Sequence, residues 1–255
     1  MRGRICIIFL IVTLAIGTSQ WIKTLPLGLS DAHAAHPTEP TGFTKSFMLD
    51  SCGGFSSTGS NPYSILEVGY QLVLEGLEND KTINLTITVL NETQLITDPE
   101  AGLVETRVVE ERETKNGKLV EVSRNYFAIC NRTNSIIYFG EDVDIYDKTG
   151  QIVVSHEGAW RAGVAGARAG IIMPGDTLIG ARYYQEIAPG IAKDRAEIIS
   201  KTEIIYTPIG DLTDCLETKE TSPLEPDAIG YKFYAPSIGL IKDGTLKLIS
   251  YGYIP

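Results

Sequence analysis

The chain has 255 residues, of which 43% are hydrophobic, and its 22 Lys and Arg against 32 Asp and Glu give a net charge of −10 at pH 7. This acidic balance excludes nucleic-acid binding, because phosphate contacts need clustered Lys and Arg, and the basic pair Lys115 and Lys118 flanks a turn. The length suffices for one well-buried core, so we expect a single folded domain over residues 61–255.

The first residues are typical of a secretory signal. Basic residues precede an apolar run over residues 5–17, which is too short to span a bilayer. Ala32 and Ala34 are small residues at alternate positions, as signal peptidase requires. We therefore expect residues 1–34 to be a signal peptide and the mature protein to be secreted or periplasmic, with no integral membrane span. An uncleaved anchor is the alternative.

The next segments predict a leader followed by strands. Residues 35–60 are rich in Pro, Gly, Ser and Thr, which is typical of a flexible leader. From Tyr70 to Val89, apolar residues alternate with Thr and Asn, the period of two that half-buried strands show. We expect Asn79 and Asp80 to form the hairpin turn between these strands.

The clearest hairpin signal lies in the middle of the chain. Residues 103–114 and 118–130 are strand-like and flank Asn116 and Gly117. The dipeptide Asn-Gly favours a two-residue turn with positive φ at both positions. We therefore expect a hairpin here, within a meander of adjacent strands.

A second hairpin is expected from residues 135–146 to residues 151–155. Between His156 and Gly190, seven glycines interrupt every periodic pattern, which predicts a long ordered loop with room for a short helix. Long loops in compact domains commonly carry function. Further strands are expected at residues 197–206, 215–221, 231–234 and 245–251. The predicted fold class is mainly β, a single antiparallel curled sheet that forms a half-barrel or open barrel with little helix.

The C-terminal region contains a recognisable series of short motifs. They are Tyr-Thr-Pro-Ile-Gly at 206–210, Cys-Leu at 215–216, Pro-Leu-Glu-Pro at 223–226, Tyr-Lys-Phe-Tyr-Ala-Pro at 231–236 and Gly-Leu-Ile-Lys at 239–242. This series resembles a group of uncharacterised exported bacterial and archaeal proteins, and residues 61–63 with Gly69 resemble their opening motif. The chain departs from their pattern at Ser237, where glycine is usual, and at Ser64 and Val68.

The resemblance implies a half-barrel like that of the lipoprotein-carrier proteins, with a ligand on its concave face. It implies no established activity. The same residues also have a purely structural explanation, because Pro236 and Gly239 bend the chain between strands and Tyr234 gives a large side chain to pack.

The cysteines favour one disulfide. Export permits pairing, and Cys130 ends one expected strand while Cys215 begins another, which favours a bridge between them and leaves Cys52 free. The alternative is that all three are buried thiols.

Several polar residues in the glycine-rich segment are candidates for a ligand site. The candidates are His156, Glu157, Trp160, Arg161, Tyr184 and Glu186. One histidine alone does not make a zinc site, and no Gly-x-Ser-x-Gly elbow presents a serine nucleophile. We predict neither a metal nor a cofactor, and a hydrogen-bonded loop histidine is the simple alternative for His156.

An acidic cluster is the other candidate. Glu141, Asp142, Asp144 and Asp147 lie within seven residues, and oxygen-rich clusters suit calcium. The spacing does not match an EF-hand, so a solvated strand edge is the alternative to a surface ion site.

Three functional hypotheses remain from the sequence. The first is a non-enzymatic binding or envelope-associated module, whose partner is a small apolar or lipid-like ligand or an envelope component. The second is an exported hydrolase or metal-dependent enzyme centred on His156, Glu157 and Arg161, with Glu186 as acid or base. The third is a structural role in a surface assembly, because exposed sheet edges pair with neighbours.

Overall fold

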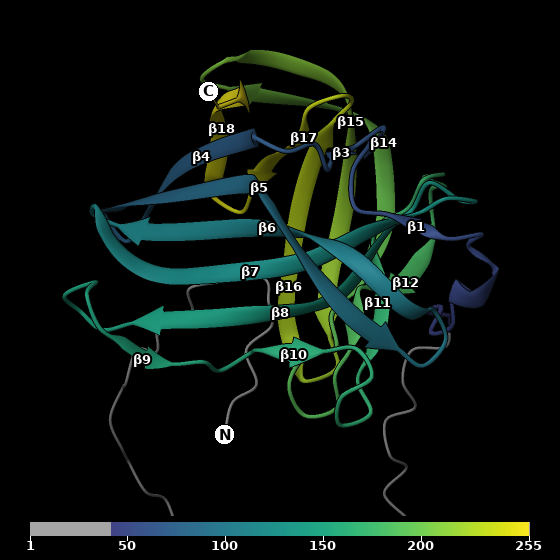
Figure 1. The fold of residues 1–255 in the computed structure, drawn as a ribbon. Coiled ribbons are helices and arrows are strands. Elements are labelled where there is room, and N and C mark those ends of the chain that lie inside the picture. Colours follow the sequence, from purple (N-terminus) through teal and green to yellow (C-terminus); the bar gives the residue numbers. More distant parts are fainter. Residues whose placement is uncertain (1–41, 255) are drawn as a thin grey trace, which may run out of the picture.

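The computed structural model describes residues 42–254, and these form a mainly β, antiparallel structure (Figure 1). One large sheet curls until it is nearly closed into a barrel with one unsealed seam. The predicted fold class is therefore confirmed. The expected signal peptide, residues 1–34, lies outside the described residues.

The strands of the sheet follow one another closely along the chain. They are β1 (Phe55–Ser56), β4 (Tyr70–Glu78), β5 (Lys81–Asp98), β6 (Gly102–Lys115), β7 (Lys118–Cys130), β8 (Ile136–Tyr146), β9 (Val153–Ser155), β10 (Trp160–Arg161), β11 (Arg168–Met173), β12 (Arg182–Tyr184), β13 (Glu186–Ile187), β14 (Arg195–Thr207), β15 (Gly210–Ser222), β16 (Glu225–Ala235), β17 (Gly239–Asp243) and β18 (Leu246–Tyr253). Their spatial order is β12-β14-β15-β16-β17-β18-β4-β5-β6-β7-β8-β11-β13, with β1 beside β7 and β9 and β10 beside β8. A separate two-stranded hairpin consists of β2 (Ser60–Asn61) and β3 (Ser64–Ile65).

Local turn chemistry fixes the long hairpins. Asn116 and Gly117 have φ values of 49° and 74°, and they join β6 to β7 with Lys115 opposite Lys118. Asn79 and Asp80, with φ values of 48° and 60°, join β4 to β5. Positive φ at both turn residues matches the twist of the flanking strands, so both predicted hairpins are confirmed.

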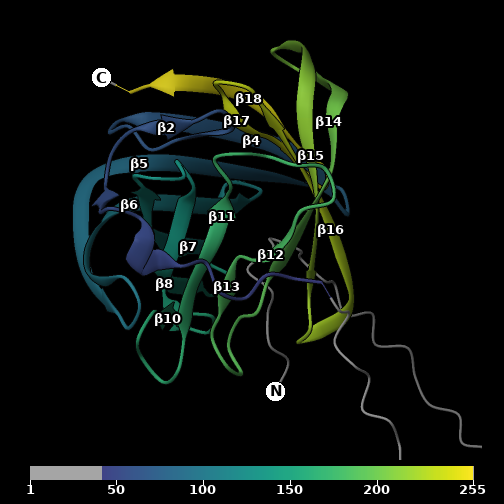
Figure 2. The same ribbon diagram turned by 90° about the vertical axis from the view of Figure 1, so that its right-hand side faces the viewer.

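The seam is formed by one short stretch of chain. β12 pairs with β14 at one edge of the sheet and β13 pairs with β11 at the other, and only Gln185 separates β12 from β13 (Figure 2). Gly170 of β11 allows the close approach, because a Cβ there would lie 2.5 Å from the carbonyl oxygens of Tyr184 and Gln185. The residues from β12 to β13 thus pair with both edges of the sheet, one edge after the other.

The expected long loop between residues 156 and 190 is present but is interrupted by short strands. These residues contain β10, β11, β12 and β13, and they contain no helix. The strands have only two to six residues, which is too short for an alternating pattern to be recognised. The expected C-terminal strands are present and longer than predicted. The sequence does not predict β17, which begins directly after the turn that precedes Gly239.

The β2–β3 hairpin connects opposite sides of the barrel. The side-chain amide of Asn61 donates hydrogen bonds to the carbonyl oxygens of Met173 (3.2 Å) and Asn134 (3.3 Å), on the β8–β11 side. On the other side, the backbone N–H of Ser237 donates to the carbonyl of Pro62 at 2.8 Å. These contacts fix the segment that follows, residues 63–66, against the barrel interior.

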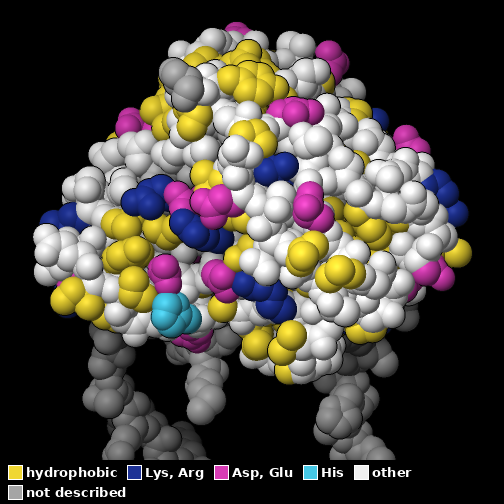
Figure 3. All heavy atoms as spheres, in the orientation of Figure 1, with side chains coloured by type: hydrophobic (Ala, Val, Ile, Leu, Met, Phe, Trp, Pro, Cys, Tyr) yellow, Lys and Arg dark blue, Asp and Glu magenta, His cyan; other side chains and the backbone are white. Residues whose placement is uncertain are grey.

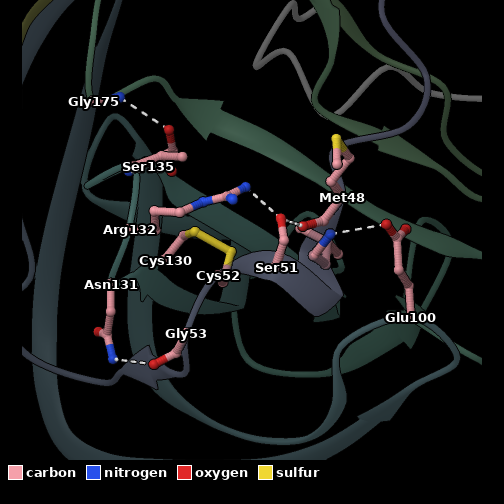
Figure 4. Close-up of a disulfide and its surroundings, with 12 residues drawn as sticks. Met48, Ser51, Cys52, Gly53, Glu100, Cys130, Asn131, Arg132, Ser135 and Gly175 are labelled. Atoms are coloured by element: carbon pink, nitrogen blue, oxygen red, sulfur yellow. Dashed lines mark hydrogen bonds between the residues drawn. A yellow bond between two sulfur atoms is a disulfide. The ribbon is translucent and has the colours of Figure 1, made fainter.

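The disulfide joins Cys52 to Cys130, so the predicted bridge between Cys130 and Cys215 is wrong (Figure 4). The short strand β1 pairs with the end of β7, with Phe55 opposite Cys130, and this brings Cys52 to its partner. Cys215 is a buried free thiol on β15, a strand that does not pair with β7.

The described part of the expected leader, residues 42–60, packs against the barrel. Leu49 is buried in the 3₁₀ turn η1 (Leu49–Ser51), and its N–H donates to Glu100 at 2.8 Å. Arg132 donates a hydrogen bond to the hydroxyl of Ser51 beside the disulfide (Figure 4). The composition rich in small residues predicted a flexible leader, but the disulfide and the pairing of β1 fix this part of it to the barrel.

Candidate functional site

The barrel contains a partly open cavity of ≈ 140 Å³. One water needs about 10–15 Å³ of such space, so the cavity has room for a small organic molecule. It is lined by Tyr63, Ser64, Ile65, Leu66, Tyr70, Leu72, Ile87, Val89, Val109, Glu111, Asn125, Phe127, Tyr138, Ile172, Met173, Gln185, Glu186, Asp194, Glu220, Lys232, Tyr234, Ile238, Gly239 and Leu240.

One wall of the cavity is apolar over most of its area. β4, β5 and β7 contribute Leu72, Val89 and Phe127, all of which are buried. Tyr138 of β8 stacks on Phe127 with ring centroids 5.0 Å apart. This wall offers an environment in which a hydrocarbon group is favourably removed from water.

Another part of the lining, which we call the polar wall, carries buried charge. The ammonium group of Lys232 on β16 lies 3.2 Å from a carboxylate oxygen of Glu220 and 3.8 Å from one of Asp243. Lys232 is directly opposite Asp243 in the sheet. The side-chain amide of Gln185, the residue at the seam, donates to the other oxygen of Glu220 at 3.2 Å. The seam and the charged wall are therefore one structural unit.

Further carboxyl groups face the same space. Glu186 of β13 accepts a hydrogen bond of 2.6 Å from the backbone N–H of Asp194, which immediately precedes β14. Asp194 is only 2% exposed, and its Oδ1 atom has no hydrogen-bond partner among the described residues. Glu111 extends from β6 into the cavity. Four carboxyl groups and one ammonium group thus line the cavity.

The acid–base state of this wall follows from burial. Desolvation raises the pKa of Glu111 to about 7 and that of Glu186 to about 8. Burial and the neighbouring Glu186 raise the pKa of Asp194 well above its usual value. Burial alone would lower the pKa of Lys232, but Glu220 and Asp243 raise it well above its ordinary value. At neutral pH the wall therefore holds a charged lysine together with carboxyl groups that retain protons.

The structure does not bring the predicted site residues together. His156 is 71% exposed, and its Nδ1 lies 2.9 Å from a carboxylate oxygen of Asp144 and 2.9 Å from the carbonyl oxygen of Val143. Glu157 is also exposed. Figure 3 shows acidic and basic side chains mixed over this face, with the one histidine of the described residues at the surface. This pair of residues forms part of a solvated surface.

Trp160 and Arg161 have structural partners. Trp160 is buried and stacks edge-on against Tyr138 at 5.1 Å. Arg161 lies over the ring of Tyr126 at 4.1 Å and forms a 2.7 Å ion pair with Asp142. These contacts hold β10 against β7 and β8.

The two remaining candidates lie at the seam. Tyr184 is buried beneath Phe43 (6.2 Å between ring centroids), so it fixes the N-terminal segment to the seam. Glu186 lines the cavity, and it is the one residue of the predicted set that does so.

The acidic cluster does not form an ion site. Asp142 pairs with Arg161 and with the hydroxyl of Tyr126, and Asp147 accepts hydrogen bonds from Thr149 within its own turn. The described residues contain no group of three or more His, Cys, Asp or Glu side chains arranged to hold a metal ion. The alternative of a solvated strand edge therefore fits this segment better.

Sequence reasoning missed most of the residues that define the polar wall. These are Glu111, Asp194, Glu220 and Lys232. Glu111, Asp194 and Glu220 each have a charged residue next to them in the sequence, as in Lys-Glu-Thr at 219–221, and so occupy stretches with charge on both faces, whereas Lys232 stands between Tyr231 and Phe233. A shift of one residue exchanges the two faces of a strand, so the pattern alone does not show which charges turn inward.

Comparisons with other proteins give no relative: no family model, no curated protein and no solved structure matches the chain. Among the described residues, the structure has no helix of the length and hydrophobicity that a membrane span requires.

Proposed function

We propose that the protein is an exported, non-enzymatic binding protein that holds a small amphipathic molecule inside the barrel. The observation that carries this proposal is the cavity itself, whose lining combines many hydrophobic side chains with a cluster of buried carboxyl groups around Lys232. Binding sites for small molecules commonly combine a mainly hydrophobic lining with a few placed polar groups. The proposal retains the apolar or lipid-like ligand expected from the sequence and adds a polar head group.

Two observations support the exported location. The N-terminal sequence is typical of a secretory signal. The Cys52–Cys130 disulfide also fits an oxidising compartment, where such bonds form and persist. An extracellular or periplasmic binding protein accounts for both.

The experiment is a titration of the purified mature protein with six-carbon amphiphiles: hexan-1-ol, hexylammonium and hexane-1-sulfonate. Trp160 is the only tryptophan among the described residues, and it stacks on Tyr138, which lines the cavity. Its fluorescence therefore reports on occupancy. We expect saturable binding of at least one of the three probes at one site per chain.

A matched pair of variants on one strand locates the site. Val89→Phe on β5 places a larger side chain in the cavity, whereas Leu95→Phe adds similar bulk where the side chain is 59% exposed. We expect Val89→Phe to abolish saturable binding and Leu95→Phe to leave it unchanged. Equal binding by the two variants, or no saturable binding of any probe to the unmodified protein, would refute the proposal.

A further inference from the structure

We infer that the ligand carries a primary ammonium group, which the carboxyl groups around Asp194 bind at the polar wall of the cavity. This inference rests on the proposed function, since it assigns the chemistry of the head group to the same cavity. It commits to one ligand class, a small organic amine with an apolar tail.

The first step of the argument is the imbalance of charge. Glu111, Glu186, Asp194 and Glu220 line the cavity, and Lys232 is the one basic side chain among the lining residues. Lys232 is already engaged by Glu220 and by Asp243. A second cation at this wall would have carboxyl groups to pair with as they lose their protons, whereas an anion would find one ammonium group that is already paired.

The second step is an unpaired acceptor at a defined point. Among residues 42–254, Oδ1 of Asp194 has no hydrogen-bond partner, although Asp194 is 2% exposed and lines the cavity. Buried carboxylate oxygens are normally hydrogen-bonded, and leaving one unpaired is costly. An ammonium N–H is a donor of matching charge, and an –NH₃⁺ group has three such donors.

The third step is the apolar wall, which favours a ligand that has an apolar tail as well as a positive charge. Leu72, Val89 and Phe127 line the same cavity as the carboxyl groups. A bare inorganic cation would leave this surface without a partner. An alkyl or aromatic amine satisfies both walls.

The predicted pH dependence follows from the protons that these carboxyl groups hold. Titratable groups from the surrounding strands face Glu186 and Asp194, and a bound cation would favour their ionised forms. The groups that act on Glu186 or Asp194 are Glu141 on β8, Glu220 on β15 and Lys232 on β16. Those that act on Glu111 of β6 are Lys232, Asp243 on β17, Glu121 on β7 and Glu220. With the pKa of Glu111 at about 7 and that of Glu186 at about 8, amine binding should release protons near neutral pH.

The experiment compares the three six-carbon probes on the unmodified protein from pH 6 to pH 9. We expect hexylammonium to bind more tightly than hexan-1-ol, and hexane-1-sulfonate to bind most weakly. Hexylammonium affinity should rise with pH, by up to about tenfold per unit where one proton is released. Calorimetry in two buffers of different ionisation enthalpy measures that proton release.

Asp194→Asn tests the assigned acceptor. We expect about tenfold or greater loss of hexylammonium affinity, with hexan-1-ol affinity unchanged, which also shows that the variant is folded. The control is Glu113→Gln, which changes another buried carboxyl group on β6. Burial raises the pKa of Glu113 to about 7, but its side chain does not line the cavity. This control should leave the binding of both probes unchanged.

The outcomes separate the inference from the proposed function. If hexan-1-ol or hexane-1-sulfonate binds as tightly as hexylammonium, or if Asp194→Asn retains full hexylammonium affinity, the inference is wrong while the cavity remains a binding site. If none of the probes shows saturable binding, the proposed function itself is wrong.

Discussion

The two walls of the cavity are built at very different energetic cost. The apolar wall on β4, β5 and β7 buries hydrocarbon against hydrocarbon, which stabilises the folded chain directly. The polar wall on β13, β15 and β16 buries carboxyl groups and an ammonium, and the desolvation of such groups can exceed what their pairing returns. A fold that needed only stability would be served by hydrocarbon on both walls, so the polar wall is the part of the cavity that the proposed binding function would account for.

The largest effect on stability is expected from removing the one cation of the polar wall. Lys232→Met removes the charge that compensates Glu220 and Asp243, which are almost fully buried. Removing one partner of a buried ion pair typically costs about 3–5 kcal/mol, and we expect the free energy of unfolding to fall by this amount in urea denaturation.

The specificity of that loss is checked in two ways. Lys81→Met, on the exposed start of β5, should change the free energy of unfolding by less than about 0.5 kcal/mol. Adding Glu220→Gln and Asp243→Asn to Lys232→Met should restore much of the lost stability, because no uncompensated charge then remains. A loss no larger than that of Lys81→Met would show that the polar wall is not an ion-paired unit.

The difference between the walls also explains what the sequence could predict. The hairpins around the apolar wall follow from local information, since Asn116 and Gly117 determine a turn type whatever the rest of the chain does. The alternation of apolar and polar residues between Tyr70 and Val89 likewise indicates directly which side chains are buried. Fold class and the first half of the barrel were therefore accessible before the structure.

The polar wall depends on information that local patterns do not contain. Gln185, Glu186 and Asp194 meet Glu220 because two edges of the sheet come together at the seam. The pairing of Cys52 with Cys130 likewise depends on β1 joining the sheet. Short strands and contacts across the barrel are set by tertiary structure, and the sequence gives no periodic signal for them.

A change of intermediate size is expected where the two walls meet. Gly170→Ala would place a Cβ 2.5 Å from the carbonyl oxygens of Tyr184 and Gln185, so β11 must move away from the seam. Such overpacking typically costs about 1–3 kcal/mol. Hydrogen exchange should accelerate at the amide of Gln185, which donates to the carbonyl of Asp194, while amides of β4 and β5 keep their protection.

The matched control for the seam lies on the same strand. Arg168 is exposed at the start of β11, and Arg168→Ala should leave both stability and exchange unchanged within about 0.5 kcal/mol. Unchanged exchange at Gln185 in Gly170→Ala would mean that the seam does not depend on this close approach.

The smallest effect is expected for His156→Ala, which removes the residue that sequence patterns alone favoured as the centre of an enzyme. Its side chain is 71% exposed, and its contact with Asp144 is a surface interaction that contributes at most about 1 kcal/mol. We expect unfolding free energy to change by no more than that, and hexan-1-ol affinity and metal content to remain the same. Loss of probe binding comparable to that of Val89→Phe would place function on the exterior of the barrel and end the assignment to its two walls.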